Sequence, residues 1–303
     1  MIILLYSPIL ILTSIILVST AFIFLIKKQP KYNLIYFIKL TTRLTGNVDN
    51  MNKTKRDSIR KINHILLFIG LILLWLICLI IIINITGSSS GMLPTNNNMV
   101  LIFIQLLLNV ENRSEILFNF GWFYYLLLFF FYALFLLMIT NEFTRKSKRF
   151  IFPFNFVSKF VLIGEEIDGY GSYLYFAIGH LFASFFCPPM IFLSILGMSS
   201  IGDLMASQIG IRYGKRTISW NHQKTWEGTI TATITCFIIC FFFIGIIWGI
   251  IFSISFLVFD TLTGKGFKKI DLSDNILIPI GCTIIFLIVR FVFNLSYYTI
   301  FLG

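Results

Sequence analysis

A polar, basic segment at residues 202–229, GDLMASQIGIRYGKRTISWNHQKTWEGT, lies between long apolar runs of the chain. It combines two acidic residues with glycines, lysines and hydroxyl side chains. Asp203 stands at the end of an apolar run and offers the hard carboxylate oxygen that Mg²⁺ prefers. Glycines let a backbone approach a phosphate closely, and two lysines, Lys215 and Lys224, can offset the charge of a triphosphate. A chemical function is therefore best argued from this segment.

The first half of the segment has a small residue at every fourth position. On a helix this spacing gives one face with almost no side chains: Gly202, Ala206, Gly210 and Gly214. Asp203 and Ser207 would form the adjacent stripe. Such a face is equally typical of close helix packing in membranes. For Asp203, the structural alternative to a metal ligand is a salt bridge with Arg212 or Lys215.

The second half, Lys224-Thr225-Trp226-Glu227-Gly228-Thr229, has the composition of a helix start. Thr225 could bind phosphate or metal, or act as the N-cap of a helix through residue 229. A helix beginning there would direct its N–H groups and positive dipole end toward an anion. Glu227, in the first turn, could complement that dipole or serve as a base or second metal ligand. The segment is not a P-loop, because no GxxxxGK[ST] follows a strand.

The composition places the segment in a membrane protein. The chain has 303 residues, of which 57% are hydrophobic, 17% aromatic and 12% charged, and its mean hydropathy is +0.89. A soluble domain could not bury that much apolar surface, whereas a bilayer can solvate it. The net charge is +11. The positive-inside rule explains this excess of Lys and Arg as that of cytoplasmic loops, so no nucleic acid partner is expected. The five cysteines lie in apolar surroundings and are expected to be buried.

Apolar runs of about 20 residues predict the membrane-spanning helices. The runs are 1–26, 64–86, 116–140, 172–201, 229–259 and 275–301, with an interfacial segment at 98–110. Pro188-Pro189 predicts that 172–201 forms two helices, or one span followed by a re-entering helix. The run 229–259, about 46 Å long at 1.5 Å per residue, predicts a tilted helix or a hairpin. The expected fold is all-α, a polytopic transmembrane helix bundle of about six to eight spans.

The basic loops give the expected organisation of the chain. Loops 27–63, 141–171 and 202–228 fall on one face, which the positive-inside rule makes cytoplasmic. The segment at 202–229 is then a cytoplasmic loop suited to a nucleotide. We expect an N-terminal membrane helix and basic loop at 1–59 and a membrane-embedded catalytic domain at 60–303.

The pattern GD-x2-AS-x2-G-x3-GK, followed by KT-x-EGT, resembles the nucleotide-binding segment of the dolichol kinase family. These enzymes are multi-spanning, CTP-dependent polyprenol kinases of the endoplasmic reticulum. Four further motifs resemble the family's RK-x2-H, E-x2-R, acidic DERD-type loop and DN-x3-P: Arg60–His64, Glu142–Arg145, Glu165–Gly169 and Asp274–Pro279. The resemblance covers about residues 60–290. Two departures are Ile167, where a basic residue is usual, and Asp260, in place of a glutamate expected ahead of Asp274.

The resemblance implies transfer of the γ-phosphoryl group of CTP to the terminal hydroxyl of dolichol. The product, dolichyl phosphate, supports protein glycosylation, and the lipid substrate would arrive laterally from the endoplasmic reticulum membrane. It implies that Asp203 binds Mg²⁺ and that Glu227 orients the triphosphate or the metal. Asp168 or His64 would be the base for the alcohol. The nucleotide-binding residues that it implies are Ser207, Gly210, Gly214, Lys215, Lys224, Thr225, Gly228 and Thr229.

Other functions stay open. A phytol-type kinase is one, and a phosphatidate cytidylyltransferase is another: that family has a similar K-T-x-E-G ending, although its acidic segment typically begins with Ser-Asp. Attack at the α-phosphorus would release pyrophosphate, whereas a kinase releases CDP. A third possibility, from a different class, is a non-enzymatic transporter or scaffold that binds anionic lipid through its basic face.

Overall fold

A computed structural model describes residues 53–87, 121–146, 169–264 and 273–295, with Leu93, Ile104, Gln105 and Tyr297. The described part is mostly helical, which confirms the helical class expected for a membrane bundle. The predicted span at 1–26, almost all of the segment at 98–110 and the acidic residues 165–168 lie outside the described residues. The division into domains at residues 59 and 60 stays a prediction.

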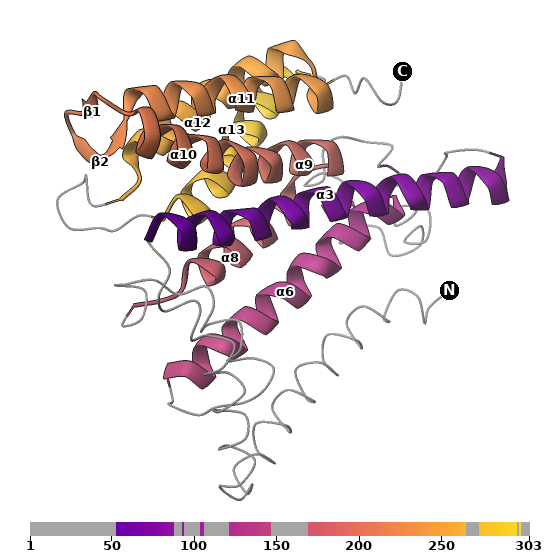
Figure 1. The fold of residues 1–303 in the computed structure, drawn as a ribbon. Coiled ribbons are helices and arrows are strands. Elements are labelled where there is room, and N and C mark those ends of the chain that lie inside the picture. The colour runs from indigo at the N-terminus through magenta and orange to yellow at the C-terminus, as the bar shows by residue number, and fades with distance from the viewer. Residues whose placement is uncertain are drawn as a thin grey trace, which may run out of the picture. The chain divides into compact units, whose positions relative to one another are not determined.

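The helices and strands follow one another along the chain as in Figure 1. They are α3 (Lys53–Thr86), α6 (Trp122–Lys146), α8 (Ser172–Phe186), α9 (Pro189–Gly197), the π-helix η2 (Met198–Gly202), α10 (Asp203–Tyr213), β1 (Thr217–Ile218), β2 (Asn221–Thr225), α11 (Trp226–Ile244), α12 (Ile246–Leu262) and α13 (Asp274–Phe293). The polar segment 202–229 therefore contains α10, both strands and the first turn of α11.

Within the described residues, five helical stretches are long and apolar enough to cross a membrane. They are Lys61–Ile85, Trp122–Phe143, Pro189–Tyr213, Trp226–Ile244 and Asp274–Phe293. The apolar helices α8 and α12 are shorter. These stretches agree with a membrane protein, while the total of about six to eight spans stays a prediction.

Two chain breaks in the long apolar runs confirm expectations from the sequence. Pro188-Pro189 ends α8 and begins α9, because a proline fits the first turn of a helix but not its interior. The run 229–259 is divided at Gly245, whose φ of 85° favours glycine. The helices α11 and α12 on either side of Gly245 pack extensively against each other. The run is therefore a helical hairpin.

The chain divides into two compact units, Met1–Asp57 with Phe129–Ala177, and Ser58–Leu128 with Ile178–Gly303. In the second unit α11 packs between α10 and α12, and α12 also contacts α13. Every residue of α9 is buried. The largest fully buried side chains of this unit are Tyr124, Phe123, Phe192, Trp248, Phe252, Phe256 and Phe286. The core is therefore built from aromatic residues of several helices.

A short β-hairpin between α10 and α11 was not predicted from the sequence. The strands β1 and β2 are antiparallel, pairing Thr217 with Thr225 and Ile218 with Asn221, with an irregularity between the two pairs. The backbone N–H of Trp226 donates to the carbonyl of Arg216 over 2.9 Å and closes the hairpin where α11 begins. The hairpin places Lys224 on a strand rather than in an irregular loop.

Candidate functional site

The start of α11 is organised by Thr225, in one of the two roles that the sequence left open for this residue. Thr225 is the N-cap, and its Oγ1 accepts a hydrogen bond from the backbone N–H of Gly228 over 3.4 Å. Glu227 lies in the first turn, and its Oε2 accepts the backbone N–H groups of Lys215 and Arg216, each over 3.2 Å. These bonds fasten the end of the α10 segment to the first turn of α11, while the Lys215 side chain remains exposed.

The small-residue face of α10 packs directly against α11. A Cβ on Gly228 would stand 2.4 Å from the carbonyl oxygen of Ala206 and 3.0 Å from the nitrogen of Gly210. A Cβ on Gly214 would stand 2.7 Å from Oγ1 of Thr225. The interpretation as a helix-packing face is therefore confirmed. A phosphate contact at Gly210, Gly214 and Gly228 stays a prediction.

Asp203 begins α10 directly after the π-helix η2 and is only 6% exposed. Its Oδ1 accepts a hydrogen bond from Nζ of Lys61 in α3 over 2.9 Å. The same ammonium donates to the backbone carbonyl of Asp203 over 3.1 Å. Lys61 therefore holds both the side chain and the backbone of Asp203.

The structural alternative for Asp203, a salt bridge with Arg212 or Lys215, was wrong in its partners. Both residues are exposed, and the carboxylate pairs with a residue 142 positions away along the chain. Nine residues at 100° each put Arg212 on the face of α10 opposite Asp203, and Lys215 lies beyond the end of that helix. A local salt bridge was therefore geometrically excluded once α10 formed.

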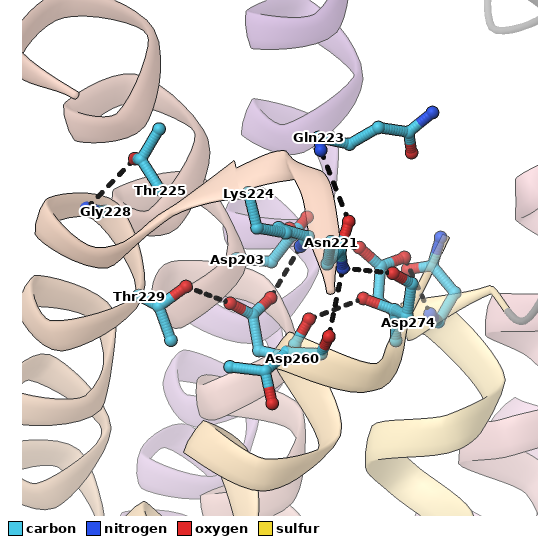
Figure 2. A network of polar contacts seen from close by, with 12 residues as sticks. Asp203, Asn221, Gln223, Lys224, Thr225, Gly228, Thr229, Asp260 and Asp274 are labelled. Carbon is cyan, nitrogen blue, oxygen red and sulfur yellow. Dashed lines mark hydrogen bonds and ion pairs between the residues drawn. The ribbon is translucent and has the colours of Figure 1, made fainter. Parts of the chain in front are cut away.

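Lys224 lies among carboxylates from three helices (Figure 2). Its Nζ is 2.5 Å from Oδ1 of Asp260 in α12 and 3.8 Å from Oδ2 of Asp274 in α13. Burial of the ammonium opposes its charge, but the charges of Asp260, Asp274 and Asp203 outweigh this effect and raise the pKa of Lys224 above its ordinary value. Lys224 is therefore positively charged at every physiological pH.

Thr229 completes the contacts of Asp260. Its hydroxyl donates to Oδ2 of Asp260 over 2.7 Å, and both residues are fully buried. The two carboxylate oxygens of Asp260 are thus occupied, one by Lys224 and one by Thr229. Ser207 is half-buried on α10, one turn beyond Asp203.

The residues present fit a magnesium ion bound together with phosphates. Oδ2 of Asp203 accepts no hydrogen bond from the described residues. The cluster also holds three carboxylates, Asp203, Asp260 and Asp274, against two ammonium groups, Lys61 and Lys224, which leaves a formal charge of −1. No group of three or more His, Cys, Asp and Glu in the described residues could hold a metal alone. Mg²⁺ on a nucleotide, however, is usually held by one or two carboxylates plus phosphate oxygens.

The predicted bases are placed differently. His64 is half-buried on α3, three residues after Lys61, so it lies on the same side of the helix one turn on. Asp168 lies outside the described residues. In the first unit, Glu142 is buried and accepts hydrogen bonds from the backbone N–H of Gly171, over 3.1 Å, and from the Tyr173 hydroxyl. It holds the chain that follows the acidic loop.

Sequence reasoning assigned no role in the site to Lys61, Asp260, Asp274 or Asn221. Asp260 carried a usable signal, because a carboxylate inside an apolar run is as unusual there as at Asp203. Lys61 and Asp274 were noted only within motifs, Asp260 was noted only as a departure from the family pattern, and Asn221 carried no signal. The prediction that the cysteines are buried is confirmed for Cys187, Cys236, Cys240 and Cys282, whereas Cys78 is half-buried.

No known protein family, curated protein or solved structure matches this chain. The chemistry of the site has to be argued from its own residues. Those residues form a buried, ion-paired cluster at the start of α11, with the exposed cations Lys215 and Arg216 beside it. Such an arrangement can bind an anion and neutralise charge that develops on it.

Proposed function

We propose that this protein transfers the γ-phosphoryl group of CTP to the terminal hydroxyl of a polyisoprenoid alcohol such as dolichol. CTP and dolichol come from the resemblance of segment 202–229 to dolichol kinases. We place the reaction in the endoplasmic reticulum membrane, with the β-hairpin of β1 and β2 on the cytoplasmic side.

The observation that carries the proposal is the position of Lys224. It stands two residues before the first turn of α11, it is charged, and carboxylates of α12 and α13 hold it in place. An ammonium group beside the positive end of a helix dipole is suited to phosphate oxygens. The cost of burying these charges in an apolar bundle also favours a functional reason for them.

The reaction breaks the bond between the γ-phosphorus and the β,γ-bridging oxygen and forms a bond from that phosphorus to the alcohol oxygen. CDP leaves with the bonding electron pair, and the proton of the alcohol passes to a base. Mg²⁺, held by Asp203 and the phosphates, would neutralise charge on the triphosphate. Lys224 and Lys215 would hold the phosphates, and Lys61 would keep the Asp203 carboxylate aligned. The glycines and Thr225 would keep the first turn of α11 close to α10.

The base for the alcohol is either His64 or Asp168. His64 is supported by its place on α3, one turn from the lysine that holds Asp203. A base on this helix could receive the proton of an alcohol that enters from the bilayer. The lipid tail would then stay in the membrane during the reaction.

The test uses the purified full-length chain in lipid nanodiscs with γ-labelled CTP, Mg²⁺ and either dolichol or phosphatidate. We expect labelled dolichyl phosphate and release of CDP, with unlabelled ATP in excess competing poorly. The Asp203→Asn variant serves as the matched inactive control. Formation of CDP-diacylglycerol and pyrophosphate without dolichyl phosphate would identify a cytidylyltransferase instead. Turnover of neither lipid would favour a non-enzymatic protein.

A further inference from the structure

We propose that Asn221 is a positioning residue that fixes β2 to the end of α12 and thereby sets Lys224 in place for the triphosphate. This inference rests on the proposed function, since it assigns Asn221 a role in nucleotide binding. Nothing in the sequence pattern indicates such a role, and the side chain of Asn221 bonds to Thr261, Thr263 and Gln223 rather than to Lys224 or Asp203.

The side chain of Asn221 is buried, with 1% of the residue exposed. Its Nδ2 donates to the carbonyl oxygens of Thr261 over 3.0 Å and of Thr263 over 2.6 Å. Its Oδ1 accepts the backbone N–H of Gln223 over 3.3 Å. Figure 2 shows Asn221 on β2 between Gln223 and the chain that continues from Asp260. One amide group thus joins β2 to the last turn of α12.

The chemistry of this contact requires a carboxamide. The last carbonyl groups of a helix have no partner inside the helix, and here two such carbonyls are served by both N–H bonds of one amide. An aspartate could not donate to them, and a serine or threonine has only one donor. The amide oxygen also holds the turn of β2 through Gln223, so three of the four hydrogen-bonding positions of the side chain are used.

The contact acts on Lys224 through the backbone. Asn221 bonds to the chain just after Asp260, and Lys224, three residues further along β2, pairs with Asp260 itself. Two links therefore join the same short stretches of β2 and α12. The long stem of a lysine cannot fix a backbone, whereas the short side chain of asparagine can. Without Asn221 the strand could move while Lys224 still reached Asp260, and its ammonium would no longer be preset for the phosphates.

The experiment compares Asn221→Leu, Asn221→Gln and His222→Ala with the unaltered full-length chain in nanodiscs. Leucine keeps the branched shape and removes every hydrogen bond without adding charge. Glutamine restores the amide on a longer stem, and His222 is the exposed neighbour on β2, outside the site. Two quantities are measured: KM and kcat for CTP in the dolichol assay, and amide hydrogen exchange of residues 217–225 without nucleotide.

For Asn221→Leu we expect faster exchange in residues 217–225, with α11 and α13 unchanged, and a KM for CTP about tenfold higher with kcat within about twofold. Glutamine should recover part of the KM, and His222→Ala should match the unaltered chain. A merely structural role would lower kcat through loss of active molecules and leave KM unchanged. That result, or unchanged exchange, would overturn the inference. If the unaltered chain turns over no CTP, the proposed function fails, whereas the exchange data still decide whether Asn221 holds the hairpin.

Discussion

The Lys61–Asp203 ion pair and the ion-paired cluster around Lys224 differ in how far they are shielded from solvent. The Lys61–Asp203 pair is buried on both sides, with side-chain exposures of 7% and 8%. Around Lys224, the side chain of Asp260 is 1% exposed, but Lys224 and Asp274 are 20% and 27% exposed. The first pair joins one ammonium to one carboxylate, whereas the second cluster joins one ammonium to several.

This difference separates two tasks. A closed one-to-one pair is costly to break, because either partner alone would be a buried, uncompensated charge. A partly open cluster with more carboxylates than cations can exchange one partner for a ligand. We therefore assign Lys61 to holding Asp203 and Lys224 to meeting the triphosphate. The variants below are chosen to break this distinction or to sharpen it, beginning with the largest effect.

The largest effect is expected for Asp203→Asn. The amide oxygen can still accept from Lys61, so the chain should fold and insert, but the ligand of Mg²⁺ is lost. Metal ions contribute several kcal/mol of charge stabilisation, so turnover should fall by about 10³-fold. Turnover is measured in the CTP and dolichol assay, with hydrogen exchange as the check on folding. Retained turnover would count against any metal role for Asp203.

Replacing the other partner of this pair, Lys61, should lower the free energy of unfolding. Lys61→Met leaves the Asp203 carboxylate buried without its partner, which costs about 3–5 kcal/mol. The measurement is equilibrium unfolding in mixed micelles. The double variant Lys61→Met with Asp203→Asn should recover most of the loss while remaining inactive.

The matched control for Lys61 is Arg212→Met. It removes the same charge from an exposed position on α10 and should change stability by less than about 0.5 kcal/mol. If both variants lost a similar free energy of unfolding, the Lys61–Asp203 pair would contribute no more stability than an exposed charge.

The cluster around Lys224 should respond in substrate binding and also in stability, because Lys224→Met leaves the buried Asp260 carboxylate without its cation. Lys224→Met removes the proposed phosphate contact, so kcat/KM for CTP should fall about 10- to 100-fold, which corresponds to about 1.4–2.8 kcal/mol. Lys224→Arg keeps the charge and should retain more activity. An unchanged KM for CTP in Lys224→Met would remove this lysine from the nucleotide site.

The raised pKa of Lys224 adds a pH test with a definite sign. A lysine whose pKa is higher in the folded state stabilises it fully below its ordinary pKa of about 10.4 and loses that contribution only as the pH rises through the folded value. The stability difference between the unaltered chain and Lys224→Met should therefore be constant from about pH 6 to pH 9. A change within that range would mean that another group titrates in the cluster.

The sequence was a good guide to local features of the fold. Pro188-Pro189 predicted the first helix break, the length of the run 229–259 left a hairpin as one of two alternatives, and Thr225 was identified as a possible N-cap. These features depend on residues a few positions apart. The strands β1 and β2 are too short to give a recognisable alternation of apolar residues, so the hairpin was missed.

The contacts of the site were mostly beyond the sequence. Lys61 and Asp203 are 142 positions apart, and no periodicity relates them. Asn221 serves carbonyls 40 and 42 residues away, which only the folded chain brings near. Asp260 is the exception, since its charge within an apolar run could have been recognised by the reasoning used for Asp203.

The last pair of variants tests the glycines at which α10 and α11 approach closely. Gly228→Ala would place its Cβ 2.4 Å from the Ala206 carbonyl, and such overpacking costs about 1–3 kcal/mol. Gly70→Ala on α3 is the matched control: nothing lies within 4 Å of its Cβ, so alanine should stabilise that helix by about 0.5–1 kcal/mol. Equilibrium unfolding of the two variants compares them directly. If Gly228→Ala left the free energy of unfolding unchanged, the two helices could move apart at no cost in stability. The close approach of α10 to α11 would then be explained by phosphate binding rather than by packing.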